Sequence, residues 1–559
     1  MVAVSFYYLG TGAAAPVSAY IFPGAGSGPG SASASTTPLA AVPPPVHNTS
    51  AANLEAAWAE FVALLGREHV RTEPDELARH ATNDWTSHLP APFAAAATAS
   101  AAATNCASCT PFLVLYPATT EDVAGIAKIC HARRIPMTAF SGGTSVEGHF
   151  AATRGGVSID FSRMDRIVAL HPADLDAVVQ PGVGWERLNA ELAAHGLFFP
   201  PDPGPGALVG GMVATGCSGT NAARHGPMRD WVVALTVVLA DGTVIRTRRR
   251  PRKSAAGYDL TRLFVGSEGT LGLVTEATLR LAVRPPRESV AVASFPSVAH
   301  AAGTAAAVVA AGVPLAAAEL LDDVAMRCIN TAGATTRSHW RETPTLFFKF
   351  AGTPAAVAEQ EAHVRRLAAL HGATSFELAA SPAERDELWS ARKEVLWSVM
   401  ALRRDPGDAP PDDNGNRHGD GDSVGDSVWT TDVAVPLSAL ATIVQETKDD
   451  MAARGLLGAI VGHVGDGNFH AILLFSPRRA GERGAAEAVV HRMVARAIAL
   501  DGTVSGEHGV GLGKRDYLPL ELGPAAVDTM RRLKLALDPL CLLNCDKVVR
   551  VEPAGVRGR

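Results

Sequence analysis

The chain has 559 residues, of which 47% are hydrophobic, 19% are charged and 53 are glycine. Its 50 basic and 56 acidic residues leave a formal net charge of −6. This balance argues against a polybasic protein that binds nucleic acid by neutralising phosphates. Seven cysteines in a chain of this length do not form a disulfide scaffold, so a reducing compartment is expected. The composition is typical of a large, soluble enzyme with an extensive core.

The first 54 residues contain no Asp, Glu, Lys or Arg. Residues 23–45 are rich in Gly, Ser, Ala and Pro, and such a segment buries too little apolar surface to offset chain entropy. An organelle transit peptide is similarly poor in acidic residues, but it is usually rich in Arg, which this segment lacks. A targeting presequence, a disordered tail and a misassigned start therefore all stay open.

Apolar spacing predicts the first regular elements. A helix is expected from Asn53 to Arg71, because apolar residues recur there at helical spacing. Phe112–Tyr116 is expected to form a buried strand, followed by a helix that Thr119 or Thr120 caps. A second strand, Pro136–Phe140, leads into a glycine-rich loop. The alternation of strands and helices predicts an α/β or α+β fold.

Residues 289–318 carry no Asp, Glu, Lys or Arg and are the one place where a membrane span could be proposed. Prolines and glycines interrupt this stretch. A strand at Ser289–Phe295 and a buried helix near Val298–Ala311 explain it better, so no transmembrane span is expected. Further along, residues 403–426 are rich in Gly, Asp and Pro, which predicts an exposed acidic loop.

Three loops rich in glycine and hydroxyl residues occur in the first half of the chain, at Ser141–Gly148, Gly210–Asn221 and Phe264–Val274. Such a loop directly after a strand leaves backbone N–H groups free to bind an anion such as pyrophosphate. One loop alone is better explained as an ordinary tight turn. Three together are typical of a protein whose backbone approaches a flat cofactor that carries phosphate groups.

The segment Val461–His470 contains two histidines seven residues apart, His463 and His470. On a helix they would lie about 10.5 Å apart, too far for one ion. On a straight strand they would point to opposite faces of the sheet. A turn through Gly465–Asn468, which includes the strong turn signal Asp-Gly, would bring both imidazoles together. The alternative is two unrelated histidines on either side of a hairpin.

Gly506–Gly511 holds the adjacent pair Glu507 and His508 between glycines. One of these side chains can bind a metal while its neighbour transfers a proton. Two histidines and one carboxylate make a ligand set that leaves open positions for a substrate. Arg392, within Leu388–Glu394, is by its own pattern only a base on a helix, which most often faces solvent.

Several blocks of the sequence resemble the FAD-binding domain of the vanillyl-alcohol-oxidase flavoprotein superfamily. They are Phe140–Ser145, Pro181–Val183, Ala214–Asn221, Met228–Asp230 and Gly266–Gly272. Together with the histidine and carboxylate motifs, they are most similar to the family of FAD-dependent D-lactate dehydrogenase (cytochrome), glycolate dehydrogenase and D-2-hydroxyglutarate dehydrogenase. The resemblance covers residues 55–550.

The resemblance implies an α+β fold and four segments along the chain. Residues 1–54 would be a low-complexity presequence or disordered tail, and 55–285 a two-subdomain FAD-binding domain of the PCMH type. Residues 286–552 would form the substrate-binding cap and C-terminal FAD-oxidase domain, a ferredoxin-like antiparallel sheet covered by helices. Residues 553–559 would be a tail.

The resemblance also implies the site residues. Ser141, Gly142, Gly143, Thr144 and Ser145 would hold the pyrophosphate of FAD. The other FAD-binding positions would be Pro181, Gly182, Thr215, Gly216, Gly219, Thr220, Asn221, Gly226, Gly272, Val274 and Asn544. One divalent metal, Zn²⁺ or Mn²⁺, would be bound by His463, His470 and Glu507. His508 would be the general base, and Arg392 would bind the substrate carboxylate.

The implied activity is oxidation of a D-2-hydroxy acid, with D-lactate to pyruvate as first choice and glycolate or D-2-hydroxyglutarate as alternatives. FAD would pass the electrons to cytochrome c or a quinone, in mitochondria or another organelle. Two remoter alternatives are a transferase resembling alkyl-dihydroxyacetone-phosphate synthase and a flavin-free metallohydrolase. The oligomeric state is open, with a homodimer as one option.

The sequence departs from the family pattern at three places. Ser141 stands where the family usually has Gly, and Cys545-Asp546 stands where it has Pro-Gly. A left-handed backbone at position 141 would be strained in a serine. The lysine that relatives often carry before the strand Thr430–Pro436 is missing, which favours a monocarboxylate substrate.

Overall fold

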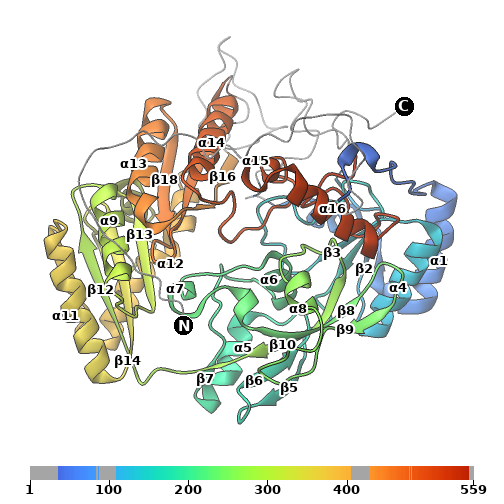
Figure 1. Cartoon of the computed structure of the whole chain (residues 1–559), viewed down its shortest axis with the longest axis horizontal. Helices are drawn as coiled ribbons and strands as arrows, with labels where there is room; N and C mark the ends of the chain where they lie inside the picture. Colours follow the sequence, from blue (N-terminus) through green and yellow to red (C-terminus); the bar gives the residue numbers. More distant parts are fainter. Residues whose placement is uncertain are drawn as a thin grey trace, which may run out of the picture.

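The computed structural model describes residues 36–83, 86, 109–403, 427–476, 479 and 481–552. The expectations for residues 1–35, for nearly all of the acidic loop and for the tail 553–559 lie outside this part. Figure 1 shows two units beside each other, each built on β-sheet with helices packed against it. We call them the N-terminal unit, which carries the elements up to β11, and the cap unit, which carries β12 to α14.

The N-terminal unit contains a four-stranded sheet in the order β1-β2-β4-β3. Strands β2, β4 and β3 are parallel, and β1 is antiparallel to β2. Helices α1 and α4 share one apolar core with this sheet. The elements are Val70–Arg71 (β1), Leu113–Leu115 (β2), Met137–Phe140 (β3), Val157–Asp160 (β4), Ala51–Leu65 (α1), Pro74–Arg79 (α2) and Thr120–Arg133 (α4).

A five-stranded antiparallel sheet follows in the order β5-β6-β10-β8-β9, and the short strands β7 and β11 pair with each other. Helix α6 contains part of the second glycine-rich loop and packs into the core of this sheet. The strands are Ile167–His171 (β5), Asp176–Val179 (β6), Leu197–Phe198 (β7), Val232–Val238 (β8), Val244–Arg246 (β9), Leu273–Arg280 (β10) and Ala282–Val283 (β11). The helices are Trp185–Leu192 (α5), Val209–Thr215 (α6), Ala222–His225 (α7) and Leu260–Phe264 (α8).

The cap unit is an eight-stranded antiparallel sheet in the order β15-β12-β14-β13-β18-β19-β16, with β17 paired to β19. Alternate residues separate two cores: Ala291 and Ala293 of β12 face one, whereas Val290 and Val292 face the other. The strands are Arg287–Ser294 (β12), Ala317–Leu321 (β13), Thr345–Gly352 (β14), Ser375–Leu378 (β15), Ser427–Thr430 (β16), Val433–Ala434 (β17), Leu457–Gly462 (β18) and Asn468–Phe475 (β19).

Helices cover both faces of the cap sheet. The first core is covered by Val298–Ala310 (α9), Pro354–Leu370 (α11), Leu437–Ala453 (α13) and Glu482–Ala499 (α14). The second is covered by Asp323–Ala332 (α10) and Pro382–Met400 (α12). Two last helices, Leu518–Leu522 (α15) and Pro524–Leu537 (α16), return the chain to the N-terminal unit (Figure 1).

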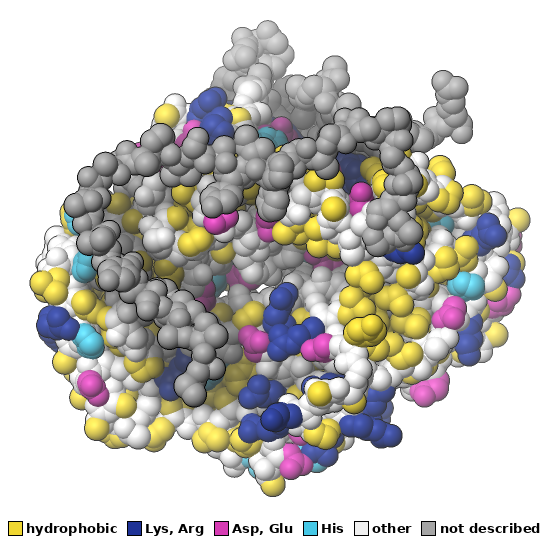
Figure 2. Space-filling view, viewed as in Figure 1, with side chains coloured by type: hydrophobic (Ala, Val, Ile, Leu, Met, Phe, Trp, Pro, Cys, Tyr) yellow, Lys and Arg dark blue, Asp and Glu magenta, His cyan; other side chains and the backbone are white. Residues whose placement is uncertain are grey.

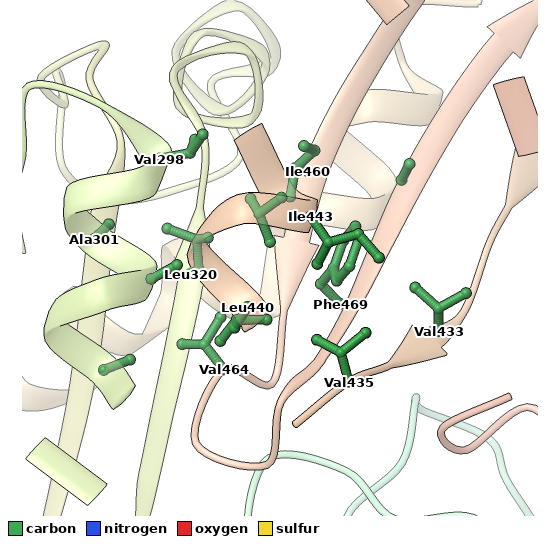
Figure 3. Packing of buried hydrophobic residues seen from close by; sticks show 14 of the residues in the cluster. Val298, Ala301, Leu320, Val433, Val435, Leu440, Ile443, Ile460, Val464 and Phe469 are labelled. Atoms are coloured by element: carbon green, nitrogen blue, oxygen red, sulfur yellow. The ribbon is translucent and has the colours of Figure 1, made fainter. Parts of the chain in front are cut away.

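The first core extends to the turn that joins β18 to β19. Figure 3 shows Val464 of this turn among the apolar side chains of that core, together with Leu440 of α13 and Phe469 of β19. Val464 is fully buried. The turn that carries the two histidines is therefore anchored by packing as well as by its own hydrogen bonds.

The structure confirms most of the elements expected from the sequence. Strands β2, β3 and β12 and helix α9 occur where expected, and Thr119 caps α4 in a capping box with Asp122. The first helix was expected to reach Arg71, and this is wrong. Helix α1 ends at Leu65 because Gly66, with a φ of 89°, turns the chain toward β1. No described helix is long and apolar enough to cross a membrane.

Candidate active site

A cavity of about 860 Å³ lies between the glycine-rich loops of the N-terminal unit and the cap sheet. Cofactor and small-molecule sites have volumes of this size. In Figure 2 the surface is hollowed near the middle of the view, between the two units that Figure 1 separates. The expected FAD positions at the cavity wall are Ser141, Gly142, Gly143, Thr144, Ser145, Pro181, Thr215, Gly219, Thr220, Gly272, Val274 and Asn544.

Four other expected FAD positions lie behind this wall: Gly182, Gly216, Asn221 and Gly226. A Cβ on Gly182 would lie 2.5 Å from the Phe161 carbonyl oxygen, so this glycine is required by packing. Gly216 ends α6 with a left-handed backbone. The Asn221 side chain donates to the Pro200 carbonyl at 3.0 Å. The structure therefore places these residues where they shape the loops.

The first glycine-rich loop fits an anion. Among the described residues, the backbone N–H groups of residues 142–145 donate to no protein acceptor. Behind the loop, Asn83 Nδ2 donates to the carbonyl oxygens of Gly143 (2.7 Å) and Ser145 (2.9 Å). Asn83 thus holds these carbonyls, and the N–H groups of the loop are left for a phosphate. Gly142 has no room for a side chain, because a Cβ would lie 2.8 Å from the Gly206 carbonyl oxygen.

The two departures from the family pattern in these loops are accommodated by the backbone. The positive-φ positions of the first loop are the glycines Gly143 (64°) and Gly148 (72°), and Ser141 has no positive φ. The strain considered for Ser141 therefore does not arise. Asp546, which replaces a family Gly, does take a φ of 72°. Asp tolerates this conformation better than most residues, so the turn survives the replacement.

A hairpin brings the two histidines together. Val461 of β18 pairs with His470 of β19, and His463 follows directly after β18. The backbone N–H groups of Asp466 and Asn468 both donate to the His463 carbonyl, at 3.0 and 3.3 Å, which closes the turn. The imidazole centroids lie 5.5 Å apart. The structure thus has the folded loop that the Asp-Gly signal predicts.

His463, His470 and Glu507 meet at one point. Glu507 Oε1 lies 3.0 Å from His463 Nε2 and 3.2 Å from His470 Nε2. The other oxygen, Oε2, accepts from the Ser218 hydroxyl (2.7 Å) and the Gly219 N–H (2.9 Å) of the second glycine-rich loop. The cap histidines and the N-terminal unit therefore share this carboxylate.

The geometry of these three side chains fits a divalent metal. Two ligands of one tetrahedral Zn²⁺ lie about 3.4 Å apart when each is about 2.1 Å from the ion. The Nδ1 atoms of both histidines already have acceptors, Glu319 Oε1 at 2.9 Å for His463 and the Thr431 carbonyl at 2.8 Å for His470. Each Nε2 lone pair is then directed at the shared point, as metal-binding imidazoles require.

His508 lies directly against this cluster. Its ring stacks on His470, with centroids 4.9 Å apart and an angle of 13° between the planes. Its buried Nδ1 has no hydrogen-bond partner among the described residues. Burial lowers the pKa of His508, the nearby Asp432 carboxylate offsets this only in part, and the pKa falls to about 3. The imidazole is therefore neutral at pH 7, and its Nδ1 is free of hydrogen bonds within the described part of the chain.

The helical pattern alone suggested that Arg392 faces solvent, but its side chain is largely buried. It lies on α12 at the cavity wall, and its Nε donates to Glu319 Oε2 at 2.8 Å. The remaining guanidinium nitrogens have no protein partner among the described residues. A guanidinium with two free nitrogens suits a carboxylate ligand.

Several residues of the site were missed by the sequence analysis. Glu319 and Asp432 are buried carboxylates that contact His463 and the Glu507–His508 backbone. Asn83 supports the first loop, and Trp389 forms part of the cavity wall. Glu319 alone had a readable signal, because it is a charged residue within the otherwise apolar strand Ala317–Leu321.

Comparisons with known proteins agree with this architecture. A family model described as FAD binding domain matches residues 111–248, and one described as FAD linked oxidases, C-terminal domain, matches residues 284–548. The mitochondrial D-lactate dehydrogenase (cytochrome) of Kluyveromyces lactis is 49% identical over 79% of this chain and 74% of its own length. D-lactate dehydrogenase (cytochrome) 1, mitochondrial, of Saccharomyces cerevisiae is 43% identical over 93% of this chain and 84% of its own length.

A solved structure supports the fold. The 4-ethylphenol oxidase of Gulosibacter chungangensis has a TM-score of 0.69 and covers 91% of this chain and 99% of its own. At 19% identity this likeness shows the fold alone. Fold and cavity together define a flavoprotein oxidoreductase with a PCMH-type FAD-binding domain, which confirms the expected α+β class. The chain belongs to the FAD-dependent D-lactate dehydrogenase (cytochrome) family and is an enzyme of that family.

Proposed function

We propose that this protein oxidises a D-2-hydroxy acid, with D-lactate to pyruvate as first choice, and that it uses one divalent metal besides FAD. One observation carries this proposal: a single cavity is lined by the glycine-rich loops, the cluster of His463, His470 and Glu507, and Arg392. A cavity of this kind can hold a flavin, a metal and a small acid next to one another. The two yeast relatives described above carry names that support D-lactate as the substrate.

When bound, FAD supplies a hydride acceptor and the metal a Lewis acid that acidifies the substrate hydroxyl. Arg392 binds the substrate carboxylate through its free nitrogens and fixes which face of C2 meets the flavin. His508 accepts the hydroxyl proton at a ring nitrogen, because its imidazole is neutral and unpaired at the cavity.

The wall around Arg392 suits a small substituent on C2. Trp389, Val461 and Ile472 contribute apolar side chains to the cavity. A methyl group, as in lactate, can pack against these side chains because it has no polar atom that would lose its hydrogen bonds to water. A second substrate carboxylate would need a cation to pair with. Lys393 lines the cavity, but its side chain is exposed to solvent, so it is a weak partner. D-lactate is therefore favoured over D-2-hydroxyglutarate, which carries a second carboxylate, and over glycolate, which has no methyl group.

We also propose that cytochrome c or a quinone reoxidises the flavin and that the protein works in mitochondria. Support comes from the names of the two yeast relatives, both of which contain the words cytochrome and mitochondrial. Import assays with the full chain and with residues 36–559 would test the location. Reduction of cytochrome c and of a soluble quinone by the D-lactate-loaded enzyme would test the acceptor.

The assignment of the base is tested by His508→Ala. The variant is expected to keep bound FAD and metal but to lose flavin reduction by D-lactate by about 10²- to 10⁴-fold, because it lacks the proton acceptor. Anaerobic stopped-flow measurement of flavin bleaching gives the rate. His195→Ala, which changes an exposed histidine that does not line the cavity, is the control. Wild-type reduction rates in His508→Ala would contradict the base assignment.

The substrate is tested by anaerobic bleaching with D-lactate, L-lactate, glycolate and D-2-hydroxyglutarate. We expect D-lactate to give the highest ratio of rate to half-saturating concentration, and L-lactate to be inactive because its hydrogen on C2 faces away from the flavin. A higher ratio for glycolate or D-2-hydroxyglutarate would replace D-lactate as the substrate. Purified protein without a flavin spectrum would contradict the oxidoreductase reading altogether.

A further inference from the structure

Glu319 lies at an unusual place for a charged side chain. It is in the middle of β13, where its neighbours Ala318 and Leu320 face the first core of the cap sheet. Because alternate residues of a strand face opposite sides, Glu319 points to the other face, toward α12. Only 1% of it is exposed. A buried carboxylate is costly unless it is paired, so its partners show what it does.

Each oxygen of Glu319 has a different partner. Oε1 accepts from His463 Nδ1 at 2.9 Å, and Oε2 accepts from Arg392 Nε at 2.8 Å. The first partner belongs to the proposed metal site and the second to the proposed carboxylate site. No other described side chain hydrogen-bonds to both of these residues. One rigid group of three atoms therefore connects the two sites.

The bond to His463 fixes which ring nitrogen carries the proton. With Nδ1–H donating to Glu319, the lone pair of Nε2 is directed at the shared point with Glu507 and His470. The bond to Arg392 uses only Nε. It therefore holds the plane of the guanidinium and leaves both terminal nitrogens for a carboxylate in bidentate geometry.

We propose that Glu319 is a positioning residue that sets the separation between the metal and the carboxylate-binding arginine. A 2-hydroxy acid presents its hydroxyl and carboxylate on adjacent carbons, so the two sites must be held at one short, fixed separation. A single carboxylate shared by His463 and Arg392 provides this. The inference rests on the proposed function, because it assumes a metal at His463 and a substrate carboxylate at Arg392.

Two variants of Glu319 separate its two bonds. Glu319→Ala removes both, so the dissociation constant of the metal is expected to rise about 10- to 100-fold. The KM for D-lactate at saturating metal is expected to rise about tenfold or more, because Arg392 is no longer aligned. Glu319→Gln keeps an oxygen that can accept from His463 Nδ1–H, but its amide group cannot accept from Arg392. This variant should recover metal affinity while its KM stays raised.

Metal affinity is measured by chelator competition with elemental analysis, and KM by flavin bleaching at saturating metal. FAD content from the visible spectrum should be the same in all proteins, because Glu319 does not contact the glycine-rich loops. Asp322→Asn is the matched control: Asp322 follows the same strand, is fully buried and pairs with Lys448 at 2.7 Å. It should change neither metal affinity nor KM.

The outcomes divide clearly. Loss of both properties in Glu319→Ala, with metal affinity alone recovered in Glu319→Gln, supports the shared role. Unchanged metal affinity or unchanged KM in Glu319→Ala overturns it, as does a Glu319→Gln variant that recovers KM or fails to recover metal affinity. A wild-type protein that binds no metal overturns the proposed metal site as well. A wild type that binds metal, beside variants that bind it equally well, overturns only the role of Glu319.

Discussion

At the scale of single residues, Asp432 supports two reactive side chains by their backbones. Its Oδ2 accepts from the N–H groups of Glu507 and His508, each at 3.0 Å, and from Lys514 Nζ at 3.1 Å. Its Oδ1 accepts from Asn468 at 2.7 Å. Burial raises the pKa of Asp432, but Lys514 and the neighbouring histidines outweigh this effect and hold the pKa far below its ordinary value.

Asp432→Asn should therefore affect stability and the site together. It removes the nearer of the two carboxylates that pair with buried Lys514, and breaking a buried ion pair costs about 3–5 kcal/mol. We expect a loss of this size in the free energy of unfolding, measured with urea, and a lower metal content. Asp449→Asn, at an exposed position of α13, should stay within about 0.5 kcal/mol of wild type. Equal stability of the two variants would show that Asp432 does not act through its charge.

The sequence could predict His463, His470 and Glu507 because each lies in a short motif with glycines around it. Glu319 and Asp432 escaped because their partners are distant in sequence: Glu319 is 144 residues from His463, and Asp432 is 75 residues from Glu507. Such pairs become visible only when β13 is placed beside β18, and the residues between β16 and β17 beside the loop after α14. Their effect is on orientation, which no local residue pattern encodes.

At the scale of elements, the short helix α7 depends on an uncharged histidine. The ring of His225 packs edge-on to Phe198 and Trp231, with centroids 5.6 and 5.8 Å away. Trp231 Nε1 also donates to the His225 carbonyl at 2.8 Å. Burial, with a smaller effect from Arg224, lowers the pKa of His225 from its ordinary 6.5 to about 4.

This pKa predicts loss of stability in acid. Below pH 6.5 the unfolded chain takes up a proton at His225 that the folded chain refuses until about pH 4. The free energy of unfolding should therefore fall as the pH is lowered from about 6.5 to about 4. His225→Phe removes this proton but keeps an aromatic ring, so its Tm should fall less than that of wild type over this range. Parallel Tm curves for the two proteins would contradict the prediction.

Element boundaries were predictable where the signal was chemical and local. Thr119 and Asp122 identify the start of α4, because a capping box is a pattern of residue types. The end of α1 was missed, since the expected helix was extended to Arg71 although the apolar pattern stops at Leu65 and the positive φ of Gly66 turns the chain. Periodicity reports which face is apolar, and it does not report where the backbone changes direction.

At the scale of the whole molecule, buried charges join the two units around the cavity. Glu268 of the third glycine-rich loop accepts from the N–H groups of Val510 (2.6 Å) and Gly511 (2.8 Å), just after the Glu507–His508 pair. Glu147 of the first loop lies 3.4 Å from Lys514 Nζ. The loops expected at FAD and the loop that carries the base are thus one connected structure.

Glu268→Ala should weaken this connection. Two backbone N–H groups would lose their acceptor, and the buried His149 would lose a carboxylate that lies 3.3 Å from its Nε2. We expect the calorimetric unfolding of the FAD-loaded protein to shift to lower temperature and to separate into two transitions, one for each unit. Glu359→Ala, at an exposed position of α11, should keep the wild-type profile. A single, unshifted transition in Glu268→Ala would show that the units are joined by other contacts.

The glycine loops and the histidine hairpin could be located from the sequence because each is a short, continuous stretch of chain. The contacts between units were not predictable, since Glu147 and Glu268 occur in loops where a charged residue usually faces solvent. They are buried because the segment after Glu507–His508 packs against them, with Val510 and Gly511 at Glu268 and Lys514 at Glu147.

The return of the chain to the N-terminal unit has a consequence for biosynthesis. Leu543 is bridged to Met137 beside β3, and Asn544 donates to the carbonyl oxygens of His149 and Glu268. Asn544 follows His149 by 395 residues. At translation rates of about 5–20 residues per second, roughly 20 to 80 seconds separate the emergence of these two residues from the ribosome. For that interval the nascent flavin pocket stays open at one edge, so stable retention of FAD must await the final part of synthesis.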